Sequence, residues 1–297
     1  AVVEDVEIKK KLLAAVDSAR RPGSLVTTNT SGLSVTAIAE GRSPDFRRHW
    51  FGTHFFNPPR YMKLLEVIPT GDTDSAALAE FERFAEIILG KGVVHAKDTP
   101  NFIANRIGLF AALKAIQLMR QGGFTVEEVD RLTGPFIGRA KTATFRTIDM
   151  VGLDVFVHVA DNIYQNAPND PQREVFHVPD FMRLLVQRKI LGAKTGRGFY
   201  HKKGDEILTL DLETMEYRPQ RRADFPALET MSNIESLPER LKTVFGSRDR
   251  AAGFVRDLLT STFEYAASRI PEISDDPAAV DRAMRWGFAW EMGPFEL

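Results

Sequence analysis

Strand-like and helix-like segments alternate along the first hundred residues, and this alternation constrains the fold more than any other feature. Short apolar runs that predict strands occur at residues 1–3, 24–28, 50–56, 62–68 and 92–96. Between them, the apolar spacing of a helix occurs at residues 5–19 and 75–89. Such alternation favours an α/β layer built on a mainly parallel sheet.

The pattern changes at Asp98-Thr-Pro100. Thr99 has the residue type of a helix N-cap, and Pro100 suits the first helical position. Helical patterns then continue to about Arg188, followed by a Gly-rich loop at residues 191–200 and a charged connection at residues 202–226. We therefore predict an α/β region followed by an all-α region.

A short internal repeat marks the second half of the chain. Val129-Asp-Arg131 opens a segment that runs to Gly152-Leu-Asp154, and Val280-Asp-Arg282 opens a similar one that leads to Met292-Gly-Pro294. Duplicated helical units usually pack together to bury faces that neither buries alone, so we expect an internal pseudo-dimer. Because the chain opens in a strand-like run and closes inside this repeat, we expect it to be a fragment.

Composition excludes several classes of function. A length of 297 residues allows two domains, and a net charge of −1 gives no electrostatic support for a nucleic-acid partner. The chain has no cysteine, hence no disulfide or thiolate nucleophile, and its six histidines lack metal-ligand spacing. The most apolar helical stretch, residues 102–119, carries Arg106 and Lys114, so we expect a core helix and no membrane span. The absence of cysteine is compatible with the cytoplasm, where we expect the protein to be.

His54 and Glu66 form the most informative pair of polar residues. They lie on two strand-like segments that are joined by the turn Asn57-Pro-Pro59. A carboxylate beside a histidine fixes the imidazole tautomer and stabilises the charged ring, which makes a proton acceptor. Each residue also has a simpler interpretation: His54 could be a hydrogen-bonded core histidine, and Glu66 could lie on a solvated strand face.

Other polar positions allow two interpretations each. Asn29-Thr-Ser31 follows a strand, at the edge where α/β sheets bind ligands, yet these side chains could simply cap a turn. Asn105 lies in an apolar helix and either bonds internally or faces a site. Lys194 suggests a phosphate loop, but Ala193 replaces the glycine that such loops need, and a turn between strands is the alternative.

Taken together, these motifs resemble the L-3-hydroxyacyl-CoA dehydrogenases of fatty-acid β-oxidation over nearly the whole chain. The matching segments are residues 29–31, Gly52-Thr-His-Phe-Phe-Asn-Pro58, Glu66-Val-Ile-Pro69, Lys97-Asp-Thr-Pro100, Asn105-Arg106, Gly152-Leu-Asp154 and Lys194-Thr-Gly-Arg-Gly-Phe-Tyr200. The second helical repeat points to the long, multifunctional type, in which an enoyl-CoA hydratase unit is often fused to the dehydrogenase.

The resemblance implies a role for each residue. His54 would be the general base toward the 3-hydroxyl of an acyl-CoA thioester, and Glu66 would orient it. Ser31 and Asn105 would bond the substrate oxygen, with Ser31 close to the nicotinamide of NAD. The remaining cofactor-binding positions would be Glu4, Lys9, Asn29 and Asn57 on the nicotinamide-ribose side, and Lys194 from the helical domain.

The resemblance also implies a division of the chain. Residues 1–98 would be the C-terminal part of a Rossmann-type NAD-binding domain, 99–201 the helical substrate domain, 202–226 a connection and 227–297 an incomplete second repeat. No Gly-x-Gly-x-x-Gly turn occurs, and residues 134–149 replace a shorter Met-Gly-Pro-Phe pattern. We therefore expect the isolated chain to be inactive. A dehydrogenase of a non-CoA hydroxy acid and a silent acyl-binding scaffold are the alternatives.

Overall fold

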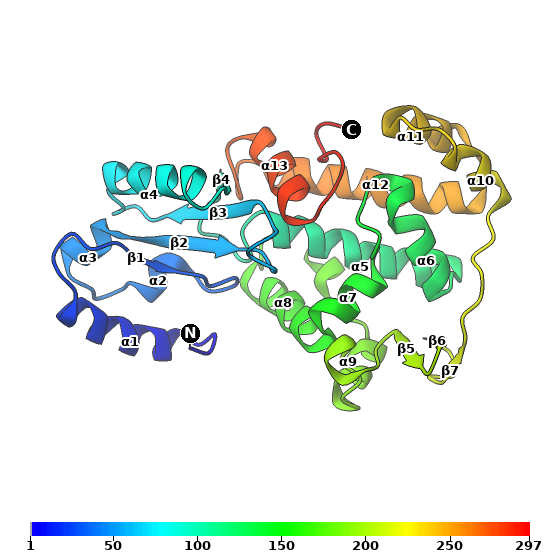
Figure 1. Cartoon of the computed structure of the whole chain (residues 1–297), viewed down its shortest axis with the longest axis horizontal. Helices are drawn as coiled ribbons and strands as arrows, with labels where there is room; N and C mark the ends of the chain where they lie inside the picture. The colour runs from blue at the N-terminus through cyan, green and yellow to red at the C-terminus, as the bar shows by residue number, and fades with distance from the viewer. Residues whose placement is uncertain (1) are drawn as a thin grey trace. The chain divides into compact units, whose positions relative to one another are not determined.

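The computed structural model describes residues 2–297 and divides into two compact units (Figure 1). The first unit holds the residues up to Arg106 together with 266–289 and 293–296. The second unit holds residues 107–265, 290–292 and 297. The later part of the chain thus contributes to both units. The domain boundaries proposed from the sequence stay a prediction.

A four-stranded sheet forms the centre of the first unit. Its strands, in the order in which they pair, are β1 (Val26–Thr28), β2 (Trp50–Phe55), β3 (Leu64–Pro69) and β4 (Gly92–His95). The outer pairs β1–β2 and β3–β4 are parallel, and the central pair β2–β3 is antiparallel. The central pair can be antiparallel because a short turn joins its strands, whereas parallel strands need a longer crossover. The predicted α/β layer is confirmed.

Helices flank this sheet and begin where the sequence places capping residues. They are α1 (Val6–Ala19), α2 (Val35–Ile38), α3 (Pro44–Arg48), α4 (Ser75–Ile87) and α13 (Pro277–Gly287). Asp5 caps α1 through a bond to the amide of Ile8, and Asp74 caps α4 in the same way. The strand expected at residues 1–3 was wrong for Val2 and Val3, which are exposed and lie in irregular chain before this cap. Ala1 lies outside the described residues.

The start of helix α5 (Ala104–Gly122) differs from the prediction. Thr99 and Pro100 do not open this helix, because Asn101 and Phe102 follow them with positive φ values of 61° and 53°. A left-handed backbone at two successive residues cannot continue a right-handed helix. The helix therefore begins only after this turn.

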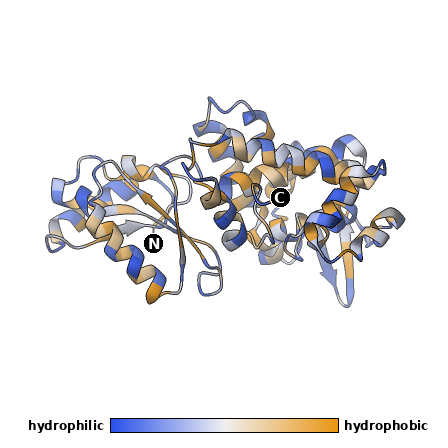
Figure 2. Ribbon diagram, turned by 90° about the horizontal axis from the view of Figure 1, so that it is seen from above, coloured by the Kyte–Doolittle hydropathy of each residue, from blue (hydrophilic) through white to orange (hydrophobic). Residues whose placement is uncertain are grey.

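The core of the first unit is formed by the sheet and two helices. Phe51, Leu65 and Val67 are fully buried and pack with Ala85 of α4, and Figure 2 shows the apolar colouring of these strands. On β4, a Cβ placed at Gly92 would lie 2.5 Å from the ring of Trp286 in α13. A segment from the second repeat thus covers part of the sheet.

The second unit is mainly helical, as predicted. Besides most of α5 and of α12 (Arg250–Ser268), it contains α6 (Val126–Thr133), α7 (Phe145–Val151), α8 (Leu153–Asn166), α9 (Asp180–Gln187), α10 (Pro226–Ser232) and α11 (Leu237–Gly246). The rings of Phe110 in α5 and Tyr265 in α12 stack with 3.8 Å between their centroids.

None of the helices in the described part of the chain combines the length and apolar character that a membrane crossing needs.

A small antiparallel sheet adds to these helices. Its strands are β5 (Tyr200–Lys203), β6 (Glu206–Leu210) and β7 (Tyr217–Pro219). Residues 202–226, which we expected to form only a connection, thus contain two strands. The segment is too charged to show the alternating apolar pattern of a half-buried strand, so the sequence did not indicate them.

The two copies of the Val-Asp-Arg motif make the same hydrogen bond. Asp130 accepts the amide N–H of Phe145 at 2.6 Å, and Asp281 accepts that of Phe295 at 2.8 Å. In the second copy this phenylalanine belongs to the Met-Gly-Pro-Phe sequence. Phe145 therefore takes the corresponding place in the first copy, 15 residues after its aspartate, where the second copy has 14. Packing of the copies as a pseudo-dimer stays a prediction.

One glycine of the Gly-rich loop is required by close backbone packing. Gly192 has φ 97°, and a Cβ at this position would overlap the backbone of Asp149. We expect Gly192→Ala to lower the free energy of unfolding by about 3 kcal/mol or more, because backbone on both sides must shift. Urea denaturation measures this loss. Gly196→Ala is the control, since Gly196 has a similar φ of 74° with open space around it, and an equal loss in both variants would contradict the packing argument.

Candidate active site

The register of β2 and β3 places His54 directly opposite Glu66. The Nδ1 atom of His54 and the Oε2 atom of Glu66 are 2.6 Å apart. Glu66 has no exposed surface, and His54 is 5% exposed. The simpler interpretation of Glu66 as part of a solvated strand face is therefore excluded, and the pair forms a buried, directly bonded unit.

The other oxygen of Glu66 binds the start of helix α5. Oε1 accepts the amide N–H groups of Ile103 at 3.1 Å and Ala104 at 2.8 Å. Amides at a helix N-terminus are unpaired within the helix and favour a negative charge. These two donors, together with His54, compensate the buried carboxylate, which would otherwise be costly. Glu66 thus links the histidine to the first turn of α5.

Aromatic rings surround the imidazole of His54. The ring centroid of Phe56 lies 4.6 Å away in an edge-on arrangement, and that of Phe102 lies 5.5 Å away. Because Nδ1 faces a carboxylate, Nδ1 carries the proton and Nε2 keeps its lone pair in the neutral ring. Nε2 has no hydrogen-bond partner among residues 2–297. This arrangement provides an oriented acceptor for one proton.

The polar turn after β1 is tied to the N-terminal segment through Glu4. The Glu4 carboxylate forms an ion pair with Lys9 at 2.8 Å and accepts hydrogen bonds from the Thr30 hydroxyl and from the Ser31 amide at 3.2 Å. Partial burial alone would raise the pKa of Glu4, but these bonds and the Lys9 charge outweigh it and lower the pKa. Asn29 accepts the amide N–H of Phe55 at 2.9 Å.

Asn105 lies in the first turn of α5, immediately after the residue whose amide Glu66 binds. It is half-buried, and its side chain makes no hydrogen bond within the described residues. Ser31 is likewise half-buried; its amide bonds Glu4, and its hydroxyl has no hydrogen bond to residues 2–297. Asn57 is exposed in the turn after β2. The first unit thus contains every predicted site residue except one.

Lys194 is the exception, because it belongs to the second unit. Its ammonium group forms an ion pair with Asp154 near the start of α8. A Cβ at Gly152 would lie 2.8 Å from the Lys194 ammonium, so glycine provides the room for this pair. The predicted role of Lys194 toward a cofactor stays a prediction.

Arg106 was not predicted as part of the site, yet it holds the turn that precedes α5. It is fully buried and donates to the carbonyl of Pro100 at 3.3 Å and to Glu272 at 3.3 Å. Glu272 also accepts from Arg269 at 2.6 Å. A charge in the most apolar helix was the available signal for Arg106. Nothing in the sequence paired it with a glutamate 166 residues away.

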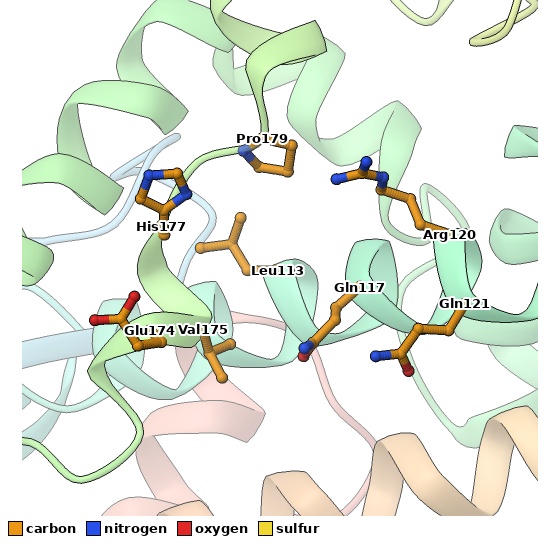
Figure 3. A pocket seen from close by; sticks show the side chains of 8 residues that line it. All are labelled: Leu113, Gln117, Arg120, Gln121, Glu174, Val175, His177 and Pro179. Atoms are coloured by element: carbon orange, nitrogen blue, oxygen red, sulfur yellow. The ribbon is translucent and has the colours of Figure 1, made fainter.

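A depression of about 490 Å³ in the second unit contains none of the predicted site residues (Figure 3). Gln117 and Arg120 of α5 line one side, and His177 and Pro179 line the other. Arg120 and Glu174 bring one charge of each sign to its lining. With balanced charge and mixed polarity, this depression does not favour one class of ligand.

Two family models match consecutive parts of the chain. Residues 1–99 match the NAD binding domain of 3-hydroxyacyl-CoA dehydrogenase, and residues 102–202 match the C-terminal domain of 3-hydroxyacyl-CoA dehydrogenase. The matches meet where the left-handed turn precedes α5.

Two curated relatives extend the comparison. A Bacillus subtilis protein named "Probable 3-hydroxyacyl-CoA dehydrogenase" is 50% identical over 296 residues, which is 100% of this chain and 37% of that protein. A 3-hydroxybutyryl-CoA dehydrogenase of Mycobacterium tuberculosis is 33% identical over 67% of this chain and 68% of its own length. The chain therefore spans little more than a third of the first relative.

A solved structure of similar fold covers nearly the whole chain. The crystal structure of a 3-hydroxybutyryl-CoA dehydrogenase from Escherichia coli aligns with a TM-score of 0.71 over 99% of this chain and 72% of that one. The identity is 21%, so this likeness concerns the fold. It agrees with a Rossmann-like region followed by a helical one.

Proposed function

Because the chain belongs to the 3-hydroxyacyl-CoA dehydrogenase family, we propose that it provides the proton-accepting part of an NAD-dependent oxidation. The substrate is an (S)-3-hydroxyacyl-CoA thioester and the product is the 3-oxoacyl-CoA of fatty-acid β-oxidation. The observation that carries this proposal is the buried His54–Glu66 pair, in which Nε2 of His54 is left without a partner in the described chain.

His54 acts as the general base. Its Nε2 atom accepts the proton of the 3-hydroxyl, and the ring becomes an imidazolium. Glu66 stabilises that positive charge across the 2.6 Å bond to Nδ1. In the reverse direction the imidazolium returns the proton to the carbonyl oxygen. A histidine suits both directions because its imidazole can accept one proton and return it.

Ser31 and Asn105 hold the reacting oxygen in place. Both side chains are half-buried and have hydrogen-bonding capacity left for a ligand. The Asn105 amide and the Ser31 hydroxyl donate to the oxygen at carbon 3, which fixes its distance from His54. Positioning of this kind supplies part of the rate enhancement without any proton transfer.

Glu4 and the polar turn after β1 suit the nicotinamide-ribose part of NAD. When bound, NAD supplies the acceptor for the hydride that leaves carbon 3. The Glu4 carboxylate, held charged by Lys9, suits the hydroxyls of a ribose, because an ionised carboxylate is an acceptor of two or more bonds. Asn29, Asn57 and Lys194 complete the proposed cofactor-binding set. An enoyl-CoA hydratase unit in the same protein and a cytoplasmic location also stay predictions.

A comparison of two substrates tests the proposal. We expect the protein that carries this chain to oxidise NADH with acetoacetyl-CoA, and to do so at least about 100-fold more efficiently than with free acetoacetate, because binding of the CoA part contributes to catalysis. Absorbance of NADH measures both rates. Equal efficiency would favour a hydroxy-acid dehydrogenase, and no turnover with either compound would favour a silent scaffold.

A further inference from the structure

A depression of about 620 Å³ in the second unit is rich in positive charge. Its walls come from α6, the 134–149 segment, the first residue of β5 and α10. The chain between β7 and α10, which is yellow in Figure 1, completes them. We call it the basic pocket, after its five cationic side chains Arg131, Lys141, Arg146, Arg221 and Arg222. Among the described side chains, its aliphatic members are Pro135 and Ala223, so a hydrocarbon ligand is not favoured.

Most of these cations have no acidic partner. Of the three carboxylates in the lining, Glu127 forms two bonds with Arg218, at 2.7 and 3.1 Å, and Glu229 pairs with Arg222 at 3.4 Å. No carboxylate of the described chain lies within ion-pair distance of the remaining four cations, Arg131, Lys141, Arg146 and Arg221. The pocket therefore has an excess of positive charge.

Asp130, the third carboxylate, is used internally. It accepts the Phe145 amide at 2.6 Å and the Tyr200 hydroxyl at 2.8 Å. Burial raises the pKa of Asp130 to about 7, so near neutral pH it carries only part of a negative charge and repels an anion less. The guanidinium of Arg146 lies 4.6 Å from the centre of the Tyr200 ring. The ring holds this cation in place at the wall of the pocket.

We propose that the basic pocket binds a phosphate-bearing small molecule. Arginine presents planar, paired donors that match phosphate oxygens, and three or more such cations around one depression fit a group with several negative oxygens. The volume lies within the range of about 300–1,000 Å³ typical of pockets for organic ligands, so inorganic phosphate alone would leave it largely empty. The proposal is independent of the proposed dehydrogenase site, because no residue is shared.

Residues 134–149 gain a role from this proposal. They carry Lys141 and Arg146, and their sequence departs from the Met-Gly-Pro-Phe pattern that the second repeat keeps. The Phe145–Asp130 bond fixes this wall of the pocket, and the Glu127 carboxylate fixes the opposite wall by accepting the amide of Arg221 at 2.9 Å. Both walls are thus anchored to α6.

Calorimetric titration of the 297-residue chain tests the proposal with three probes: adenosine 3′,5′-bisphosphate, coenzyme A and pyrophosphate. We expect binding of at least one probe, and a loss of about tenfold to hundredfold in the Arg131→Gln/Lys141→Gln variant, the effect of removing one or two charge-assisted bonds. Both side chains are exposed, so the fold should persist. Lys242→Gln/Arg248→Gln is the control, since it removes the same charge from exposed positions of the second unit outside the pocket.

The probes also separate two sources of phosphate. Binding of the bisphosphate and coenzyme A without pyrophosphate would assign the pocket to the nucleotide part of the thioester carrier. Binding of pyrophosphate without binding of coenzyme A would assign it to another phosphorylated compound. No binding of any probe at millimolar concentration, or equal weakening in the pocket variant and the control variant, would overturn the proposal.

Discussion

Alanine at position 54 is expected to lower kcat for acetoacetyl-CoA reduction by about 10²–10⁴. The imidazole is the only group placed to exchange the proton in the proposed mechanism, and its Nδ1 is already committed to Glu66 at 2.6 Å. KM should change less than kcat, because the lost interaction belongs mainly to the transition state. Steady-state rates of NADH oxidation by the protein that carries this chain measure both constants.

The chain offers a matched control for this variant. His95 of β4 also pairs with a glutamate, with 2.7 Å between its Nε2 atom and Glu82, but its side chain is 58% exposed. His95→Ala should therefore leave kcat within about twofold, since an exposed ion pair contributes little. A turnover of His54→Ala close to that of His95→Ala would remove His54 from the role of base.

The pairing of His54 with Glu66 could be predicted because it depends on local sequence. Two apolar segments joined by a Pro-rich turn form adjacent strands, and the side-chain alternation of a strand then decides which residues share a face. The alternation of strands and helices predicted the α/β layer for the same reason. These features depend on periodicity over a few residues, which one sequence contains in full.

The second bond of Glu66 could not be predicted, because it depends on the path of the chain 37 residues later. Thr99 and Pro100 carry the local signals of a helix start. Asn101 and Phe102 nevertheless take left-handed backbone conformations, which these local signals do not predict. The Glu66 carboxylate replaces the local cap. A tertiary contact therefore overrides the N-cap preference of Thr99.

The contacts that the second repeat makes within the first unit could not be predicted, for a similar reason. Lys97 bonds the carbonyl of Pro271 at 2.7 Å and Asp275 at 2.6 Å, and Arg106 reaches Glu272. Taken alone, each residue has the sequence context of a charged side chain that is either exposed to solvent or buried in the core. Only the fold brings these residues together beside the turn that precedes α5, so the bonds from residues 271–275 to Lys97 and Arg106 appear first in the structure.

Two substitutions of Glu66 separate its role in folding from its role in catalysis. Glu66→Ala leaves the amides of Ile103 and Ala104 and the Nδ1–H of His54 without acceptors in a buried place. We expect the free energy of unfolding to fall by at least about 3 kcal/mol, since each of the three unpaired groups costs about 1–3 kcal/mol. Urea denaturation of the 297-residue chain measures this loss.

Glu66→Gln should keep most of the stability and still lose activity. The glutamine oxygen can accept both amides of α5, because an amide oxygen has two lone pairs. Its NH₂ group must then face Nδ1 of His54, which turns that atom into an acceptor and moves the ring proton to Nε2. A proton on Nε2 blocks the base, and a comparable change behind a catalytic histidine lowers kcat by about 10⁴.

The combination of the two variants is the decisive result. If Glu66→Gln is as unstable as Glu66→Ala, the carboxylate charge rather than the hydrogen bonds holds α5 in place, and the tautomer argument loses its support. If Glu66→Gln is stable and retains wild-type kcat, Glu66 does not orient His54. We expect Glu66→Gln to be stable and to have a kcat lowered by about 10²–10⁴. This outcome is required if one oxygen of the Glu66 carboxylate holds the start of α5 and the other orients His54.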